Sequence, residues 1–200
     1  MYVVCSDLES IYVPEIWIAV AEKIGIEELK ITTREEPDYD KLMRRRIKIL
    51  EENKIKLNDL QDVLVEEAPF PGAKDFLDWL RSVARLIVVS DTFVEFADPW
   101  MKKLGNPLLF CNSLIVGEDG MIKEHVMRQN NGKKKVVDAL RSLNYKTIAF
   151  GDSYNDTNML LEADYGMLFC PPDNVKEQFP QFPVAYNYNE LKNIISKILK

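Results

Sequence analysis

Four acidic residues of this chain stand just beyond two apolar runs that lie far apart in the sequence. Asp7 and Glu9 follow the run YVVCS, and Asp152 and Asp156 follow the run TIAFG. Burying ionised carboxylates together is unfavourable unless they are paired, hydrogen-bonded or neutralised by a cation. Because Mg²⁺ prefers oxygen ligands, these four side chains predict a magnesium site.

Two further residues are suited to hold a phosphate group beside such an ion. Ser90 ends the apolar run LIVVS and offers a hydroxyl, and Lys133 offers a compact positive charge. Mg²⁺ commonly keeps several waters and takes a phosphate oxygen as a further ligand. The combination therefore indicates chemistry on a small phosphorylated substrate.

The elements that must position these residues alternate between helix and strand after about residue 69. Buried strands are expected over LIVVS, TIAFGDS and YGMLF, and two or three short strands over LLFCNSLIVGEDGMIKEHV, with a turn at residues 118–120. Helices are expected over GAKDFLDWLRS, TFVEFADPWMKKLG, residues 133–143 and about residues 189–199. Such alternation predicts an α/β fold with a Rossmann-like parallel sheet, which binds ligands beyond the carboxyl ends of its strands.

The region from about Pro14 to Ala68 has a different pattern, which is helical and free of strands. Pro14 suits the first turn of one helix and Gly25 its end, and a second helix is expected over YDKLMRRRIKILEEN. A third helix is expected to begin with Asn58 as its N-cap. We therefore expect a core of residues 1–13 and 69–200, with residues 14–68 inserted as a helical unit.

Composition excludes several classes of protein. The chain has 200 residues, of which 46% are hydrophobic, and a net charge of −6, which argues against nucleic-acid and acidic-membrane binders. Its three cysteines show no CxxC spacing and are expected to be free, buried thiols. No apolar run approaches the ~20 residues of a membrane span, and no signal-peptide pattern is present, so we expect a cytoplasmic protein.

The ordered motifs resemble those of the haloacid dehalogenase superfamily of phosphotransferases. The motifs are DLE at residues 7–9, Ser90 after LIVV, Lys133 at the head of a helix, and GDSYND at residues 151–156. The helical segment resembles the small cap of that superfamily. The stretches VPEIW, MRRRI, VVSDTF, GDSYNDTNML and EQFPQFP further resemble its branch acting on phosphoserine and homoserine. Each motif alone is a weak signal, but together and in order they are specific.

This resemblance implies roles for the two acidic residues of the first motif. Asp7 would be the nucleophile that forms an aspartyl phosphate. Glu9 would protonate the leaving hydroxyl and then deprotonate the acceptor. The superfamily usually has Asp where this chain has Glu9, a departure that its homoserine-using branch shares.

The resemblance also implies the phosphate and metal ligands. Ser90 and Lys133 would hold phosphoryl oxygens in the transition state. Mg²⁺ would be bound by Asp7, the main-chain carbonyl of Glu9 and Asp152, with Asp156 supporting them.

The substrate implied by the resemblance is O-phospho-L-serine, with homoserine left open as a second acceptor. Glu15 would bind the substrate ammonium, and Arg46 of the run Arg44 to Arg46 its carboxylate. Asn155 would contact phosphate or substrate. Asp91 follows Ser90 where dedicated phosphoserine phosphatases usually have glycine, so this segment is expected to contact the substrate differently.

Several residues also have structural interpretations. Two of the three arginines are expected on a solvated helix face, and Glu15 would favour a helix dipole with or without a ligand. His125 is expected at the surface, and the three tryptophans in the core. A phosphatase of another small metabolite and a catalytically silent ligand-binding relative stay open as alternatives, and the oligomeric state is not predicted.

Overall fold

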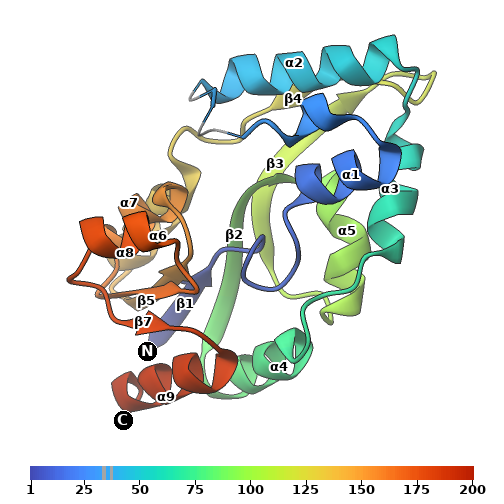
Figure 1. Cartoon of the computed structure of the whole chain (residues 1–200). Helices are drawn as coiled ribbons and strands as arrows, with labels where there is room; N and C mark the ends of the chain where they lie inside the picture. The colour runs from blue at the N-terminus through green and yellow to red at the C-terminus, as the bar shows by residue number, and fades with distance from the viewer. Residues whose placement is uncertain (33–34, 37) are drawn as a thin grey trace.

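A single mixed sheet forms the centre of the computed structural model, which describes residues 1–32, 35–36 and 38–200 (Figure 1). The strand order is β4-β3-β2-β1-β5-β6-β7. All neighbouring strands are parallel except the β3–β4 pair, which is antiparallel. The strands are β1 (Tyr2–Ser6), β2 (Arg85–Phe93), β3 (Leu109–Val116), β4 (Ile122–Val126), β5 (Lys146–Gly151), β6 (Tyr165–Phe169) and β7 (Val184–Ala185). The expected α/β fold with a mainly parallel sheet is confirmed.

Helices cover both faces of this sheet because alternate strand residues point to opposite sides. In β1, Val4 packs into the core on the side of α4, α5 and α9, whereas Val3 and Cys5 pack on the side of α6, α7 and α8. The helices are α4 (Ala73–Val83), α5 (Val94–Lys103), α6 (Gly132–Ser142), α7 (Tyr154–Glu162), α8 (Asp173–Gln178) and α9 (Tyr188–Ile198). The apolar strands are therefore buried on both faces, as their sequences indicate.

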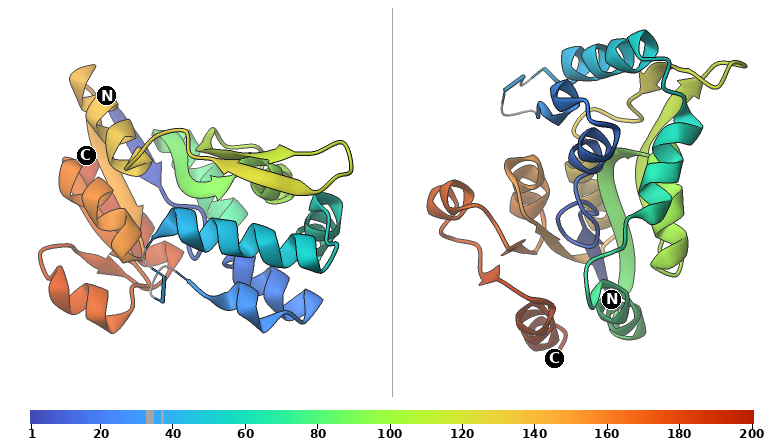
Figure 2. Two further views of the ribbon diagram at one scale, coloured as in Figure 1. Left: turned by 90° about the horizontal axis from the view of Figure 1, so that it is seen from above. Right: turned by 45° about the vertical axis from the view of Figure 1, so that its right-hand side comes forward.

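Among its described residues, the segment between β1 and α4 contains helices joined by loops and no strand of the sheet, and it lies beyond the carboxyl end of β1 (Figure 1). It contains α1 (Ile16–Ile24), a short 3₁₀ helix (Glu27–Lys30), α2 (Tyr39–Glu52) and α3 (Leu57–Glu66). Helix α3 packs beside α5, as Figure 2 shows, and α2 contacts β4. The inserted helices thus contact the rest of the molecule through α5 and β4, among other elements.

The end of α1 and the start of α3 can be compared with the helix boundaries expected from the sequence. Gly25 ends α1 with a left-handed φ of 79°, as expected for a glycine at that position. The expected N-cap of the third helix is wrong, because α3 begins at Leu57 and Lys56 precedes it. The side chain of Asp59, in the first turn of α3, accepts a hydrogen bond from the Lys56 amide at 2.7 Å. This bond gives a partner to an amide at the start of the helix.

Strand β2 continues three residues beyond its expected end at Ser90. Its pairing with β3 is regular to Val89 and resumes at Phe93, so the residues between them lie in an irregular stretch. The expected β3–β4 hairpin is confirmed, and its turn is closed by the Gly120 amide, which donates to the Gly117 carbonyl at 2.9 Å.

The three cysteines form no disulfide. All three cysteines are free, and Cys5 and Cys111 are buried, but Cys170 is exposed just after β6. The expectation of a buried thiol therefore fails at Cys170, which lies where the chain leaves the sheet. Among the described residues, no helix has both the length and the apolar character needed to cross a bilayer.

Candidate active site

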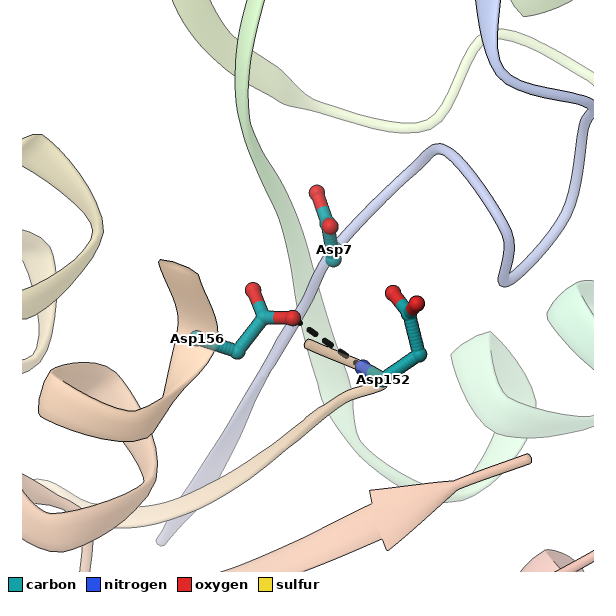
Figure 3. Close-up of side chains that lie close together, drawn as sticks. All are labelled: Asp7, Asp152 and Asp156. Atoms are coloured by element: carbon teal, nitrogen blue, oxygen red, sulfur yellow. Dashed lines mark hydrogen bonds between the residues drawn. The ribbon is translucent and has the colours of Figure 1, made fainter. Parts of the chain in front are cut away.

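Three aspartates meet at the carboxyl edge of the sheet. Strands β1 and β5 are parallel neighbours, so Asp7 and Asp152, which follow them, emerge at the same edge. Asp156 joins them from the first turn of α7. One carboxylate oxygen from each aspartate lies within 4.8 Å of the other two, an arrangement that Figure 3 shows. The expected convergence of these residues is confirmed.

Asp156 holds the loop that carries Asp152. Its side chain is fully buried, and its Oδ2 accepts a hydrogen bond from the amide of Asp152 at 3.0 Å (Figure 3). The same oxygen accepts a second bond from the amide of Ser153 at 3.1 Å. Gly151 leaves room for this carboxylate, because a Cβ at that position would overlap the Asp156 side chain. The carboxylate is therefore built into the loop, and its other oxygen, Oδ1, faces Lys133.

Lys133 places a buried ammonium between the aspartates. Its Nζ lies 2.8 Å from Asp156 Oδ1, 3.0 Å from Asp7 Oδ2 and 3.9 Å from Asp91 Oδ2. Burial alone would lower the pKa of Lys133, but Asp156 and Asp7 outweigh it and raise this pKa well above its ordinary value. The lysine is thus a fixed cation at the centre of the cluster.

The neighbouring lysines do not share this environment. Lys134 pairs with Glu162 at 3.2 Å and with Asp138 at 3.6 Å, and Lys135 donates to the side chain of Gln129 at 2.8 Å. Both are at the outer side of α6, so the geometry selects Lys133 from the KKK run.

The charge balance of the cluster favours an additional cation. Burial raises the pKa of Asp7 well above its usual range, and although Lys133 opposes this shift, Asp156 and Asp152 add to it. Burial also raises the pKa of Asp152 to about 7, with Asp156 again contributing. Three closely spaced carboxylates share one ammonium, and their hard oxygen donors fit a divalent ion such as Mg²⁺.

Glu9 does not join this cluster. Its Oε2 accepts a hydrogen bond of 2.9 Å from the amide of Ile16, the first residue of α1, and burial raises the pKa of Glu9 to about 7. Glu9 therefore adds no fourth carboxylate to the aspartate cluster, although it lines the same cavity as Asp7 and Asp152. The longer glutamate side chain instead reaches the positive end of α1, and the role expected for its main-chain carbonyl stays a prediction.

A cavity of about 220 Å³ opens above the cluster, between the sheet edge and the inserted helices. From the core it is lined by Asp7, Glu9, Ser90, Asp91, Lys133, Asp152 and Asn155, and from the inserted helices by Glu15, Trp17, Tyr39 and Arg46. The site residues expected from the sequence thus line one cavity, apart from Asp156, which lies beneath it.

Arg46 is the arginine of its run that faces this cavity. Its side chain is buried, its guanidinium carbon lies 4.5 Å from the ring centre of Trp17, and Nη2 donates to the Ile31 carbonyl at 2.6 Å. Its Nε has no hydrogen-bond partner within the described part of the chain. Burial lowers the pKa of Arg46 to about 10, which leaves it a cation at neutral pH.

The other two arginines lie on the solvated face, as expected for two of the three. Arg44 is exposed and pairs with Asp40, with 2.7 Å between Nε and Oδ2, and Arg45 is also exposed. The acidic partner of Arg44 lies one helical turn before it on the same face of α2.

Comparison with known proteins places this constellation in a family. The model of the haloacid dehalogenase-like hydrolases matches residues 6–164, which include the aspartates, Ser90 and Lys133. The chain belongs to the haloacid dehalogenase-like hydrolases.

Several relatives of this hydrolase are similar over most of their length. It is 51% identical to a phosphoserine phosphatase of Pseudomonas syringae pv. tomato, over 95% of this chain and 80% of that one. It is 49% identical to phosphoserine phosphatase ThrH of Pseudomonas aeruginosa, over 96% and 94% of the two chains. A solved phospho-aspartyl intermediate analogue of phosphoserine phosphatase has the same fold, with a TM-score of 0.77, 20% identity and coverage of 98% and 97%.

Three residues near the cavity of this hydrolase have surroundings that the sequence did not indicate. Trp17 lies in the core, as expected, and it also lines the cavity, with Arg46 over its ring. Tyr39 also lines the cavity and carried no sequence signal. The expected surface position of His125 is wrong, because it is 8% exposed and packs against the rings of Tyr39 and Phe93.

Proposed function

We propose that this hydrolase is a Mg²⁺-dependent O-phospho-L-serine phosphatase that works through a phosphoryl group carried by Asp7. One observation carries the proposal: the buried guanidinium of Arg46, whose Nε has no hydrogen-bond partner among the described residues, lines the same cavity as the Asp7–Lys133 pair. A site for phosphate and a site for a second anion thus share one small cavity. The names of the two Pseudomonas relatives support phosphoserine as the compound with these groups.

The first half of the proposed reaction transfers the phosphoryl group to the enzyme. A carboxylate oxygen of Asp7 attacks phosphorus as the bond from phosphorus to the serine oxygen breaks. Glu9 gives its proton to that oxygen, so serine leaves as a neutral alcohol. The enzyme then holds an acyl phosphate on Asp7 and an ionised Glu9.

The second half returns the enzyme to its starting state. Glu9 takes a proton from a water molecule whose oxygen attacks phosphorus, and the bond between phosphorus and Asp7 breaks. Inorganic phosphate leaves, the Asp7 carboxylate is restored, and Glu9 is protonated again. Homoserine is proposed as an alternative to water, because it carries the same ammonium and carboxylate groups as serine.

Charges of this chain would stabilise the transferring group. Ser90 and Lys133 would hold phosphoryl oxygens, and the Thr92 amide donates to Ser90 Oγ at 3.3 Å, which orients the hydroxyl. Asp7, the Glu9 main-chain carbonyl and Asp152 would hold Mg²⁺, with Asp156 supporting this set. When bound, the ion would offset the negative charge of the phosphoryl oxygens.

The inserted helices would bind the carboxylate and ammonium groups of the substrate. We assign residues 14–68 as a cap on a core of residues 1–13 and 69–200, with Arg46 on the substrate carboxylate and Glu15 on its ammonium. Asp91 and Asn155 line the cavity beside the phosphate site and would contact the substrate there. A plain phosphate ester lacks both charges, so this arrangement favours amino-acid phosphates.

A substrate panel tests this function. Phosphate release is measured from phosphoserine, phosphothreonine, a sugar phosphate and a nucleotide with Mg²⁺, in the presence and absence of homoserine. The proposal expects phosphoserine to have the highest kcat/KM and homoserine to divert phosphoryl groups into phosphohomoserine. Preference for a sugar phosphate or nucleotide would assign another metabolite, and no turnover of any ester would indicate a silent relative.

A further inference from the structure

One hydrogen bond joins the inserted helices to the segment that follows Ser90. The hydroxyl of Tyr39, the first residue of α2, donates to the main-chain carbonyl of Asp91, with 3.1 Å between the oxygens. Both residues line the cavity above the aspartate cluster. The Asp91 carboxylate lies 3.9 Å from Lys133 Nζ. The hydrogen bond from Tyr39 therefore reaches the part of the cavity where Lys133 is proposed to bind phosphate.

The same carbonyl receives a second hydrogen bond from the core. Asn112 of β3 donates from Nδ2 to the Asp91 oxygen at 3.0 Å, and its Oδ1 accepts from the Arg128 amide at 3.0 Å. A carbonyl oxygen has two lone pairs, and here one is used by the core and the other by α2. The Asp91 peptide is thus held from two sides by side chains.

Side-chain donors matter at this peptide because the sheet does not fix it. The regular pairing of β2 with β3 stops at Val89 and resumes at Phe93, so Ser90 and Asp91 lie in the irregular stretch. The carbonyl held by Tyr39 and Asn112 belongs to the Asp91–Thr92 peptide, and the amide of that peptide donates to Ser90 Oγ at 3.3 Å. Its orientation therefore affects where Ser90 stands relative to Lys133.

Packing holds the Tyr39 ring in place for this contact. The ring lies edge-on to His125, with 6.2 Å between centroids, and His125 in turn packs edge-on to Phe93 at 6.3 Å. Burial raises the pKa of the Tyr39 hydroxyl well above its usual range, so the group stays a hydrogen-bond donor at physiological pH.

We propose that Tyr39 is a positioning residue, whose hydroxyl fixes the Asp91–Thr92 peptide when α2 is seated over the cavity. Covering the cavity and placing the Ser90 hydroxyl are then coupled events. The inference rests on the proposed function at one point, namely that the Ser90 hydroxyl binds a phosphoryl oxygen. Because every phosphate ester has such an oxygen, the role of Tyr39 applies to any phosphate ester, whereas the role of Arg46 applies only to substrates with a carboxylate.

Replacing Tyr39 by Phe tests the proposal, because it removes the hydroxyl and keeps the ring. With para-nitrophenyl phosphate and with phosphoserine, kcat/KM should fall by the same factor of about three to ten, as expected for one hydrogen bond. Tyr186→Phe is the matched control, since that hydroxyl is exposed and contacts Lys176 at 3.3 Å, away from the cavity. The control should keep wild-type rates.

Two outcomes would overturn the proposal. One is an unchanged kcat/KM of Tyr39→Phe with para-nitrophenyl phosphate, and the other is a loss confined to phosphoserine, which would make Tyr39 a head-group contact. Rates are expressed per folded enzyme, with folding followed by circular dichroism, so a purely structural effect would lower the melting temperature without lowering kcat/KM. Para-nitrophenyl phosphate has no ammonium or carboxylate, so this arm tests Tyr39 whether or not phosphoserine is the substrate.

A double-mutant cycle tests the shared carbonyl. If Tyr39 and Asn112 hold the same peptide, each can partly replace the other, and Tyr39→Phe combined with Asn112→Ala should lose more activity than the product of the single losses. Losses that simply multiply would mean that the two donors act independently, which would contradict the proposed joint placement of the peptide.

Discussion

The ammonium of Lys133 and the carboxylate of Asp156 form a buried ion pair, with Nζ 2.8 Å from Oδ1. Neither side chain reaches bulk solvent, since Lys133 is 5% and Asp156 0% exposed. The same carboxylate accepts hydrogen bonds from two amides of the loop that carries Asp152. The pair therefore links the position of the lysine to the position of the Asp152 loop.

Replacing Asp156 by Asn should damage both stability and activity. The amide cannot neutralise Lys133, and breaking a buried pair by removing one partner typically costs about 3 to 5 kcal/mol. Urea unfolding measures the loss, and phosphate release measures activity. The matched control is Asp138→Asn, which breaks the partly exposed pair with Lys134 and should change the free energy of unfolding by less than about 1 kcal/mol. Equal, small effects of the two changes would contradict the linking role of Asp156.

Replacing Arg46 by Ala should separate recognition from chemistry. Loss of one partner of a buried charge pair typically costs about 2 to 5 kcal/mol, which here should raise the KM for phosphoserine. Hydrolysis of para-nitrophenyl phosphate should change far less, because that ester has no carboxylate. Arg44→Ala, on the exposed face of the same helix, is the matched control and should leave both substrates unaffected. If Arg46→Ala reduces both activities equally, or neither, the head-group assignment is wrong.

The identity of the metal should decide whether the enzyme turns over. Removing divalent ions with EDTA should abolish phosphate release, and Mg²⁺ should restore it. Ca²⁺ should compete with Mg²⁺ and inhibit, because its larger radius and looser coordination would let Asp7 bind the ion through both oxygens, which would remove the oxygen needed for attack. Initial rates at fixed Mg²⁺ and increasing Ca²⁺ measure the competition. Equal rates with either ion would count against the site formed by Asp7 and Asp152.

His125 should make stability depend on pH below neutrality. Burial lowers the pKa of His125 below its usual 6.5, although Asp40, 3.4 Å away, opposes the shift. The unfolded chain then binds a proton at a higher pH than the folded chain, so stability is complete above about pH 6.5 and falls as the pH decreases. Thermal unfolding at pH 5.5 and 7.5 should show a smaller difference for His125→Phe than for the wild type. Identical pH dependence in the two proteins would exclude this contribution.

The sequence predicts the strand-end aspartates well, because they depend on topology alone. Asp7 and Asp152 follow apolar strands, and parallel neighbours bring such residues to one edge. Residue chemistry alone could not select Lys133, since it is the first of three consecutive lysines, and the choice rested on the order of the motifs. The structure distinguishes the lysines physically, because Lys133 points inward and its neighbours point outward.

Other features depend on tertiary contacts that no local pattern reveals. The Glu9 carboxylate bonds the Ile16 amide because α1 begins beside it, and a DxE motif does not specify that rotamer. His125 lies in a strand of mixed polarity and is buried because α2 packs over the hairpin. Tyr39 meets Asp91 across 52 positions of sequence, a distance at which spacing carries no information.

The proposed mechanism requires Asp7 to carry the phosphoryl group of phosphoserine. Wild-type enzyme turning over O-phospho-L-serine with Mg²⁺ is quenched in acid within milliseconds, digested, and its peptides are weighed by mass spectrometry. Asp7→Asn, whose amide is no nucleophile, serves as the control, with its fold checked by circular dichroism. We expect one phosphoryl group on the wild-type peptide that contains Asp7 and none on the variant, which should also release no phosphate. Phosphate release by the variant at a near-normal rate, or a phosphoryl group on a different residue, would contradict the proposed mechanism.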